Sequence, residues 1–123
     1  MVLVDTSIWI RHISGSLANA DALDDLLAQE LVLGHPLVFG ELLIGDRGGR
    51  SRLLNAYQLM RELHVVPHSE VVAFVSARRL NGLGIGWIDA HLLASCLVAG
   101  AKLWTADAAL ISVAESLGIG FAA

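Results

Sequence analysis

Four of the twelve carboxylates in the sequence stand beside apolar runs rather than in polar segments: Asp5, Glu41, Asp89 and Asp107. A carboxylate in apolar surroundings is costly unless it is paired or binds a metal. Pairing options are few, because Lys102 is the only lysine and the arginines lie mostly in polar segments. Oxygen ligands without a cysteine or histidine cluster favour Mg²⁺ or Mn²⁺. Such ions bind phosphate oxygens and activate water for phosphodiester hydrolysis.

A simpler role stays open for each of these residues. Asp5, Asp89 and Asp107 could cap the helices that they precede, which is a common position for aspartate. Glu41 could reach solvent from an apolar helix, although its neighbours Phe39, Leu42 and Leu43 make this harder. These capping and surface roles account less well for the four residues together than for each alone. Asp5 and Asp107 both follow predicted strands, so they fall at the same edge of a parallel sheet.

The elements that must position these carboxylates alternate between short apolar strands and amphipathic helices. We expect strands at 2–4, 31–33, 65–66 and 102–105, with a possible terminal strand at 119–121. We expect helices at 8–13, 21–29, 36–44, 51–63, 69–80, 88–98 and 107–117. This alternation predicts an α/β fold with a parallel sheet flanked by helices. In such sheets the active site lies beyond the carboxyl ends of the strands.

Length and composition fit one compact domain over residues 1–123, with no repeat or linker. The hydrophobic fraction of 55% exceeds the usual value of about 45–50%. We interpret the excess as strands buried on both faces, as a partner interface, or as both. No apolar stretch is long enough to cross a membrane, and residues 1–5 do not resemble a signal peptide. Cys96 is the only cysteine, so no disulfide forms within the chain, and we expect a cytoplasmic protein.

The carboxylate motifs, taken in order, resemble those of PIN domains. Val2-Leu3-Val4-Asp5-Thr6-Ser7 is similar to the family's opening strand and first acidic residue. Phe39-Gly40-Glu41-Leu42-Leu43 resembles its glutamate motif, and Gly86-Trp87-Ile88-Asp89-Ala90 resembles its third acidic motif. Leu103-Trp104-Thr105-Ala106-Asp107 resembles its Thr-x-Asp motif. The four motifs stand in the family's order at near-family spacing. One departure is Leu110, where the family often has phenylalanine.

The resemblance implies a three-layer α/β/α fold with a parallel sheet of about five strands. It implies a Mg²⁺- or Mn²⁺-dependent endoribonuclease that leaves 5′-phosphate and 3′-hydroxyl ends. Asp5, Glu41, Asp89 and Asp107 would be the catalytic and metal-binding residues, and Thr6, Ser7 and Thr105 would supply hydroxyl groups to the cofactor site. The short chain favours a VapC-type toxin, with a homodimer and a small VapB-like antitoxin whose tail covers the acidic pocket.

Several other features invite a functional interpretation that the sequence leaves weak or open. The five histidines lack metal-ligand spacing, and the Gly82, Gly84 and Gly86 series lacks the context of a dinucleotide fingerprint. The loop with Arg47, Arg50 and Arg52 could contact RNA or an antitoxin, or simply be solvated. Trp9 and Trp104 are predicted core residues, whereas the role of Trp87 stays open.

Three rival functions can be compared with the nuclease hypothesis. A phospho-aspartate phosphatase of the haloacid-dehalogenase type needs a second Asp two residues after the first, where this chain has Ser7. A response-regulator receiver domain needs a Lys after its last strand, whereas Lys102 begins one. The rival from another class is a non-catalytic interaction module with the same fold. All four acidic positions are filled, which favours the enzyme.

Overall fold

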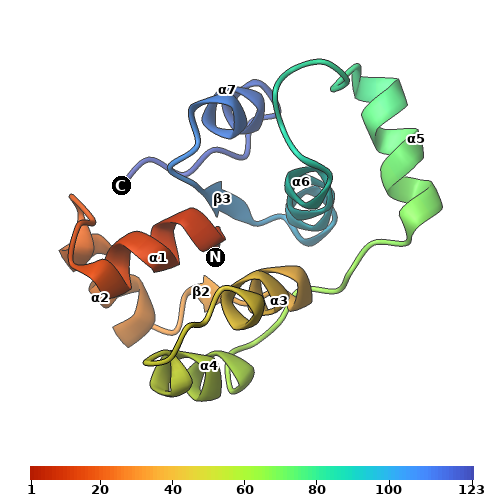
Figure 1. The fold of residues 1–123 in the computed structure, drawn as a ribbon. Helices are drawn as coiled ribbons and strands as arrows, with labels where there is room; N and C mark the ends of the chain where they lie inside the picture. The colour runs from red at the N-terminus through yellow and green to blue at the C-terminus, as the bar shows by residue number, and fades with distance from the viewer.

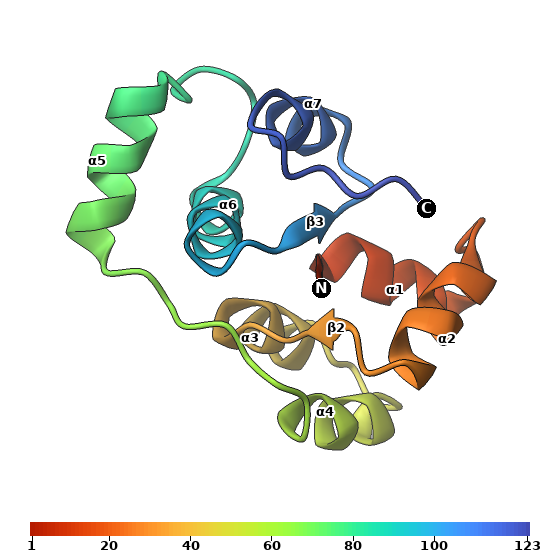
Figure 2. The same cartoon turned by 180° about the vertical axis from the view of Figure 1, so that it is seen from behind.

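The computed structural model describes all residues from 1 to 123 and shows a parallel sheet between helices. The elements follow in chain order: β1 (Val2–Val4), α1 (Thr6–Ser14), α2 (Ala20–Ala28), β2 (Val32–Leu33), α3 (Pro36–Ile44), α4 (Ser51–Gln58), α5 (His68–Arg78), α6 (Trp87–Ala99), β3 (Lys102–Trp104) and α7 (Ala108–Ser116). Figures 1 and 2 show α1 and α2 on one side of the strands, and α3 and α6 on the other. The α/β fold with helices on both faces is therefore confirmed.

The sheet has three strands in the order β2-β1-β3, all parallel. The prediction of about five strands was wrong in the strict sense. At each outer edge the chain pairs through a single residue, Glu62 beside Gly34 and Gly120 beside Leu103. Contacts this short extend the sheet laterally without forming strands.

The predicted strand at 65–66 is absent: Val66 packs elsewhere, and Val65 is exposed. Residues 61–63 meet the sheet instead: Gly34 N donates to Arg61 O, and Leu63 N donates to Gly34 O, each at 2.8 Å. Val66 is buried in a small cluster with Val71 and Ala90, between α5 and α6. Helix α4 consequently ends at Gln58 rather than near 63, since the chain turns there to reach the sheet edge.

The core lies around β1, whose three residues are all buried. A strand buried on both faces must be apolar throughout, which accounts for the unbroken Val-Leu-Val run. Helix α6 is also enclosed, because residues 90–96 are all buried. No helix is long and apolar enough to cross a membrane.

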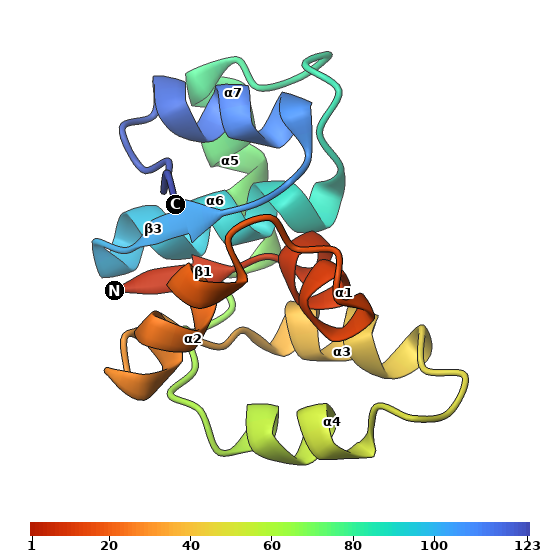
Figure 3. The same cartoon turned by 90° about the vertical axis from the view of Figure 1, so that its left-hand side faces the viewer.

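Helices α1, α6 and α7 begin at the carboxyl edge of the sheet. Figure 3 shows β1 running from the N-terminus toward the start of α1, with the first turns of α6 and α7 at the same end. Asp5 occupies the N-cap position of α1, and Asp107 that of α7. The fold therefore directs two strand ends and three helix starts toward one place.

Candidate active site

Asp5 is the most enclosed of the four predicted carboxylates, with 6% of its surface exposed. Its Oδ2 accepts hydrogen bonds from Ser7 Oγ and Thr105 Oγ1, both at 2.8 Å. Its side chain makes no capping hydrogen bond to α1, although the residue occupies the N-cap position. The simple capping role is therefore wrong for Asp5, which is instead held by hydroxyls from two segments about 100 residues apart.

Glu41 reaches the same area from the middle of α3. Its Oε1 accepts a 2.7 Å hydrogen bond from Thr6 Oγ1, which joins the start of α1 to α3. Burial raises the pKa of Glu41; the Thr6 hydrogen bond opposes this, while the charges of Asp5 and Asp89 add to it. Glu41 is partly buried and contacts the acidic site, so it does not simply extend to solvent.

Asp89 lies in the first turn of α6, and its Oδ2 accepts a 2.8 Å hydrogen bond from the Gly86 backbone N–H. Burial raises its pKa, and the charges of Asp5 and Asp107 raise it further, against the Gly86 hydrogen bond. Asp89 therefore caps α6 and also feels the other acidic residues. The Gly86 N–H is a contributor that sequence patterns did not identify, because every residue but proline has this donor.

Asp107 combines a capping role with a position at the site. Its Oδ1 accepts from Leu110 N at 2.9 Å, which is a side-chain N-cap of α7. Its own backbone N–H donates to Thr105 Oγ1 at 3.1 Å, so Thr105 connects Asp107 to Asp5. Ser7 Oγ also accepts from Ala106 N at 3.0 Å. The three predicted hydroxyls thus orient the acidic groups.

Each of the four carboxylates uses one oxygen for hydrogen bonds within the chain. The other oxygens accept no hydrogen bond within the chain: Asp5 Oδ1, Glu41 Oε2, Asp89 Oδ1 and Asp107 Oδ2. None of the four has a basic side chain within 4.0 Å, because the one ion pair in the chain joins His12 to Asp24. The site is an uncompensated concentration of negative charge with oriented oxygens, which fits a hard cation.

No three His, Cys, Asp or Glu side chains come close enough to hold one metal ion between them. Mg²⁺ commonly keeps several of its waters and uses only one or two carboxylates. The donor set therefore fits an ion held partly through water, with the hydroxyls fixing the carboxylates around it. Hydrogen bonds of this kind keep the ligands of a metal site oriented.

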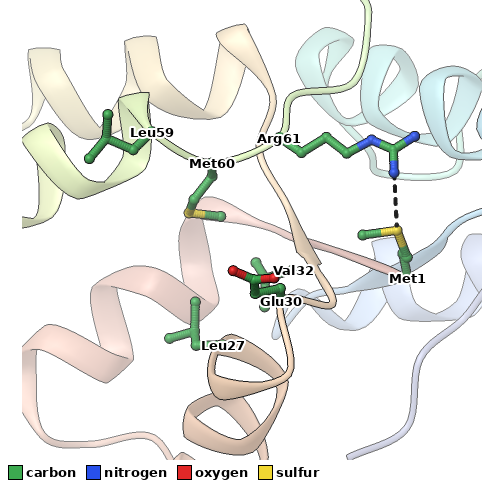
Figure 4. Close-up of a pocket in the computed structure, with 7 residues that line it drawn as sticks. All are labelled: Met1, Leu27, Glu30, Val32, Leu59, Met60 and Arg61. Carbon is green, nitrogen blue, oxygen red and sulfur yellow. Dashed lines mark hydrogen bonds between the residues drawn. The ribbon is translucent and has the colours of Figure 1, made fainter.

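A hollow of about 450 Å³ lies at the opposite, amino-terminal edge of the sheet. Figure 4 shows its lining, which includes Met1 and Val32 at the starts of strands. It holds one carboxylate, Glu30, and one guanidinium, Arg61, whose Nη1 lies 3.8 Å from Met1 Sδ. Without a concentration of acidic groups, this hollow offers no comparable chemistry.

The remaining sequence features are mainly structural. Arg50 Nη1 donates to Leu42 O at 2.8 Å and so fixes the loop between α3 and α4, while Arg47 and Arg52 are exposed. His91 is buried two positions after Asp89, so it faces another side of α6, and it packs against Trp87 with ring centroids 5.4 Å apart.

Comparison with known proteins gives one consistent family. The model of the PIN domain matches residues 2–116. The chain is 43% identical to "Ribonuclease VapC32" of Mycobacterium tuberculosis, in both strain CDC 1551 / Oshkosh and strain H37Rv, over 99% of this chain and 97% of that protein. Its fold is similar to the crystal structure of PAE2754 from Pyrobaculum aerophilum, with a TM-score of 0.59 and 20% identity, covering 94% of this chain and 90% of that one.

Proposed function

The chain belongs to the PIN domain family, as a relative of the VapC ribonucleases, and from this premise we propose that it is a divalent-metal-dependent endoribonuclease. The observation that supports the proposal most is the acidic site at the carboxyl edge of the sheet. Four carboxylates reach this site from different parts of the chain: Asp5, Glu41, Asp89 and Asp107. One oxygen of each accepts a hydrogen bond within the chain, and the other oxygen accepts none. Repulsion among these carboxylates disfavours the folded state unless a bound ligand offsets the charge.

The residues that would surround the ion are these four carboxylates, one or two of them in direct contact and the others through water, with Mg²⁺ or Mn²⁺ as the expected metal. When bound, a divalent ion supplies Lewis acidity toward the phosphodiester and makes water a stronger nucleophile at neutral pH. The chain's own contribution is orientation. Thr6, Ser7 and Thr105 hold the carboxylates through hydroxyl hydrogen bonds of 2.7–2.8 Å, so little reorganisation is needed.

The substrate that we propose is RNA, on the strength of the VapC relative. The net charge of −4 does not oppose this, because four of the acidic groups lie at the site where a cation would offset them. The test is cleavage of RNA by the purified protein with Mg²⁺ or Mn²⁺, in comparison with the same reaction in EDTA. Cleavage should require the metal. A protein that binds a partner but cleaves no RNA under any divalent ion would instead be a non-catalytic interaction module.

The biological role that we propose is that of a toxin with a small VapB-like antitoxin, acting as a homodimer. Several large apolar side chains are strongly exposed at helix ends, among them Ile44 and Leu59 at 88% each and Val98 at 79%. Isolated exposed apolar residues are ordinary, but such a set on a chain this rich in them favours partner surfaces. Light scattering of the protein alone, and with the product of a neighbouring small reading frame, tests both associations.

A further inference from the structure

A small hollow of about 130 Å³ lies between the end of α5, the loop 79–86 and the first turn of α6. Its lining includes the aliphatic side chains of Leu80 and Ile85, the indole of Trp87 and the amide of Asn81. No charged side chain lines it. The hollow therefore combines one aromatic plane with aliphatic contacts and a single neutral polar group.

Trp87 is unlike the other two tryptophans in its exposure. Its exposed fraction is 42%, whereas Trp9 and Trp104 are exposed by 2% and 6%. The His68 ring lies 5.1 Å from it, tilted by 54°, and the His91 ring lies 5.4 Å from it at 89°. The two histidines support the indole from α5 and from within α6. A large apolar ring is thus held in place while much of it stays available, as base-stacking platforms require.

Asn81 gives the hollow a means of discrimination. Its side chain is exposed and makes no hydrogen bond within the chain, so both the amide donor and the carbonyl acceptor are free. An amide can pair with the edge of a base, where donors and acceptors differ between bases. The loop backbone around it is fixed partly by Gly82 and Gly84, whose φ values of +76° and +84° favour glycine.

The hollow adjoins the acidic site without belonging to it. Trp87 and Asp89 lie two positions apart in the first turn of α6, so their side chains face different sides of the helix. Gly84 also approaches α7, because a Cβ built on it would lie 3.5 Å from that of Ala109. Figure 3 shows this loop passing beside the start of α7, which Asp107 caps. Gly86 lines the hollow and its backbone N–H donates to Asp89, so a ligand in the hollow would lie beside the turn of α6 that carries this carboxylate.

We propose, on the basis of the proposed ribonuclease function, that this hollow binds one unpaired RNA base flanking the cleaved phosphodiester. The base stacks on Trp87, and Asn81 contacts its edge. The hollow is small and lined by an indole and aliphatic side chains without a charged group, which fits a planar base. A helical antitoxin segment would need a long apolar groove with several anchor positions.

The direct test is tryptophan emission with a short single-stranded RNA of mixed sequence, in EDTA so that no cleavage occurs. The RNA should quench the emission of the wild-type protein, because Trp87 is the exposed indole. It should leave the emission of Trp87→Phe unchanged, since Trp9 and Trp104 are buried. The same oligonucleotide with abasic positions should quench weakly. Equal quenching by abasic and normal RNA, or no quenching, overturns the proposal.

The kinetic test separates positioning from folding. Trp87→Ala should raise KM for RNA about tenfold, which equals about 1.4 kcal/mol, with kcat nearly unchanged. Trp87→Phe should recover most of the loss, because it restores an aromatic face. Asn81→Ala should change the preference among bases near the cleavage point. The matched control is Leu83→Ala, a 49% exposed residue of the same loop that does not line the hollow, and it should behave as wild type.

Two results would overturn this inference while leaving the nuclease proposal intact. One is an unchanged KM in Trp87→Ala with normal cleavage. The other is weakened binding of a protein partner in that variant without any change in KM, which would make the hollow a protein contact. Failure of the wild-type protein to cleave RNA contradicts the proposed function, whereas the quenching test is read independently of cleavage.

Discussion

Two groups of polar side chains follow neighbouring strands at the same edge of the sheet, but only one has its polar atoms hydrogen-bonded within the chain. His35 follows β2 and is fully buried. Its Nδ1 accepts from Leu37 N at 3.1 Å, and its Nε2 lies 2.9 Å from Ser95 Oγ. The acidic site after β1 and β3 leaves one oxygen of each carboxylate without a partner in the chain and has no basic side chain within 4.0 Å.

The hydrogen bonds of the His35 group define its protonation. Ser95 Oγ donates to His64 O at 3.0 Å, so it accepts from His35 Nε2–H. His35 is therefore neutral with its proton on Nε2, and burial, with a smaller contribution from His91, lowers its pKa to about 4. The pKa values of Glu41 and Asp89 are raised instead, by burial first and then by like charge.

The difference separates polar groups that are satisfied within the fold from polar groups that remain available to a ligand. A buried network in which every atom is paired contributes to folding and offers nothing to a ligand. A cluster of like charges opposes folding and is retained where a cation or substrate reverses the penalty. The comparison therefore predicts that changes at the acidic site affect activity, and that changes at His35 affect stability.

The largest effect should come from removing charge at the acidic site. Asp5→Asn, Glu41→Gln and Asp89→Asn should each reduce RNA cleavage by about a hundredfold or more, with little loss of folding free energy. Cleavage rates and urea denaturation of the same preparations measure both quantities. Asp25→Asn, an exposed residue of α2, is the matched control and should cleave normally. Normal cleavage in all three variants would contradict the assignment of the site.

The next effect is stabilisation by the metal. Mg²⁺ at one hundred times its dissociation constant should add about 2.7 kcal/mol to the unfolding free energy, because it binds only the folded chain. Thermal melts with Mg²⁺ and with NaCl of equal ionic strength separate the stabilisation by metal binding from the general effect of salt. His35→Gln should keep this gain and Asp89→Asn should lose most of it. Equal gains in both variants would place the ion elsewhere.

The His35 network should make the protein sensitive to acid. Because the pKa of His35 is lower in the folded state, the neutral network stabilises the fold fully when the pH is above the pKa of the unfolded state, about 6.5. This contribution is lost as the pH falls toward the folded value of about 4. Between about pH 7.5 and about pH 5 the loss amounts to about 2 kcal/mol. Urea denaturation should show this decline in the wild type and a much smaller one in His35→Gln. The same slope in both proteins would show that other groups dominate.

The smallest effect should have the opposite sign. Without metal and at neutral pH, Glu41→Gln should be slightly more stable than the wild type, by less than about 1 kcal/mol. Because the folded pKa of Glu41 is raised, its charge destabilises the fold increasingly as the pH rises through that value. The advantage should vanish in mild acid and reverse when Mg²⁺ is added. Thermal melts at two pH values measure it, and a variant that is clearly less stable in EDTA would mean that Glu41 is a structural residue.

The sequence determined the class of fold and the identity of the acidic residues. The Val-Leu-Val run before Asp5 must be a strand buried on both faces, and a carboxylate directly after it must lie at the sheet edge. Asp107 after a second apolar run has the same property. Local patterns suffice for these inferences because each depends on only a few neighbouring residues.

The tertiary structure decided what the sheet edges pair with and how the site is held together. Val65 and Val66 have the composition of a strand, but the sheet edge is reached by residues 61–63, so Val66 packs between helices and Val65 stays exposed. The hydrogen bond from Thr105 to Asp5 spans 100 positions, and the Asn81–Trp87 hollow depends on how α5, α6 and their loop meet. These features arise from long-range packing, and a local sequence pattern does not specify which distant residues will come into contact.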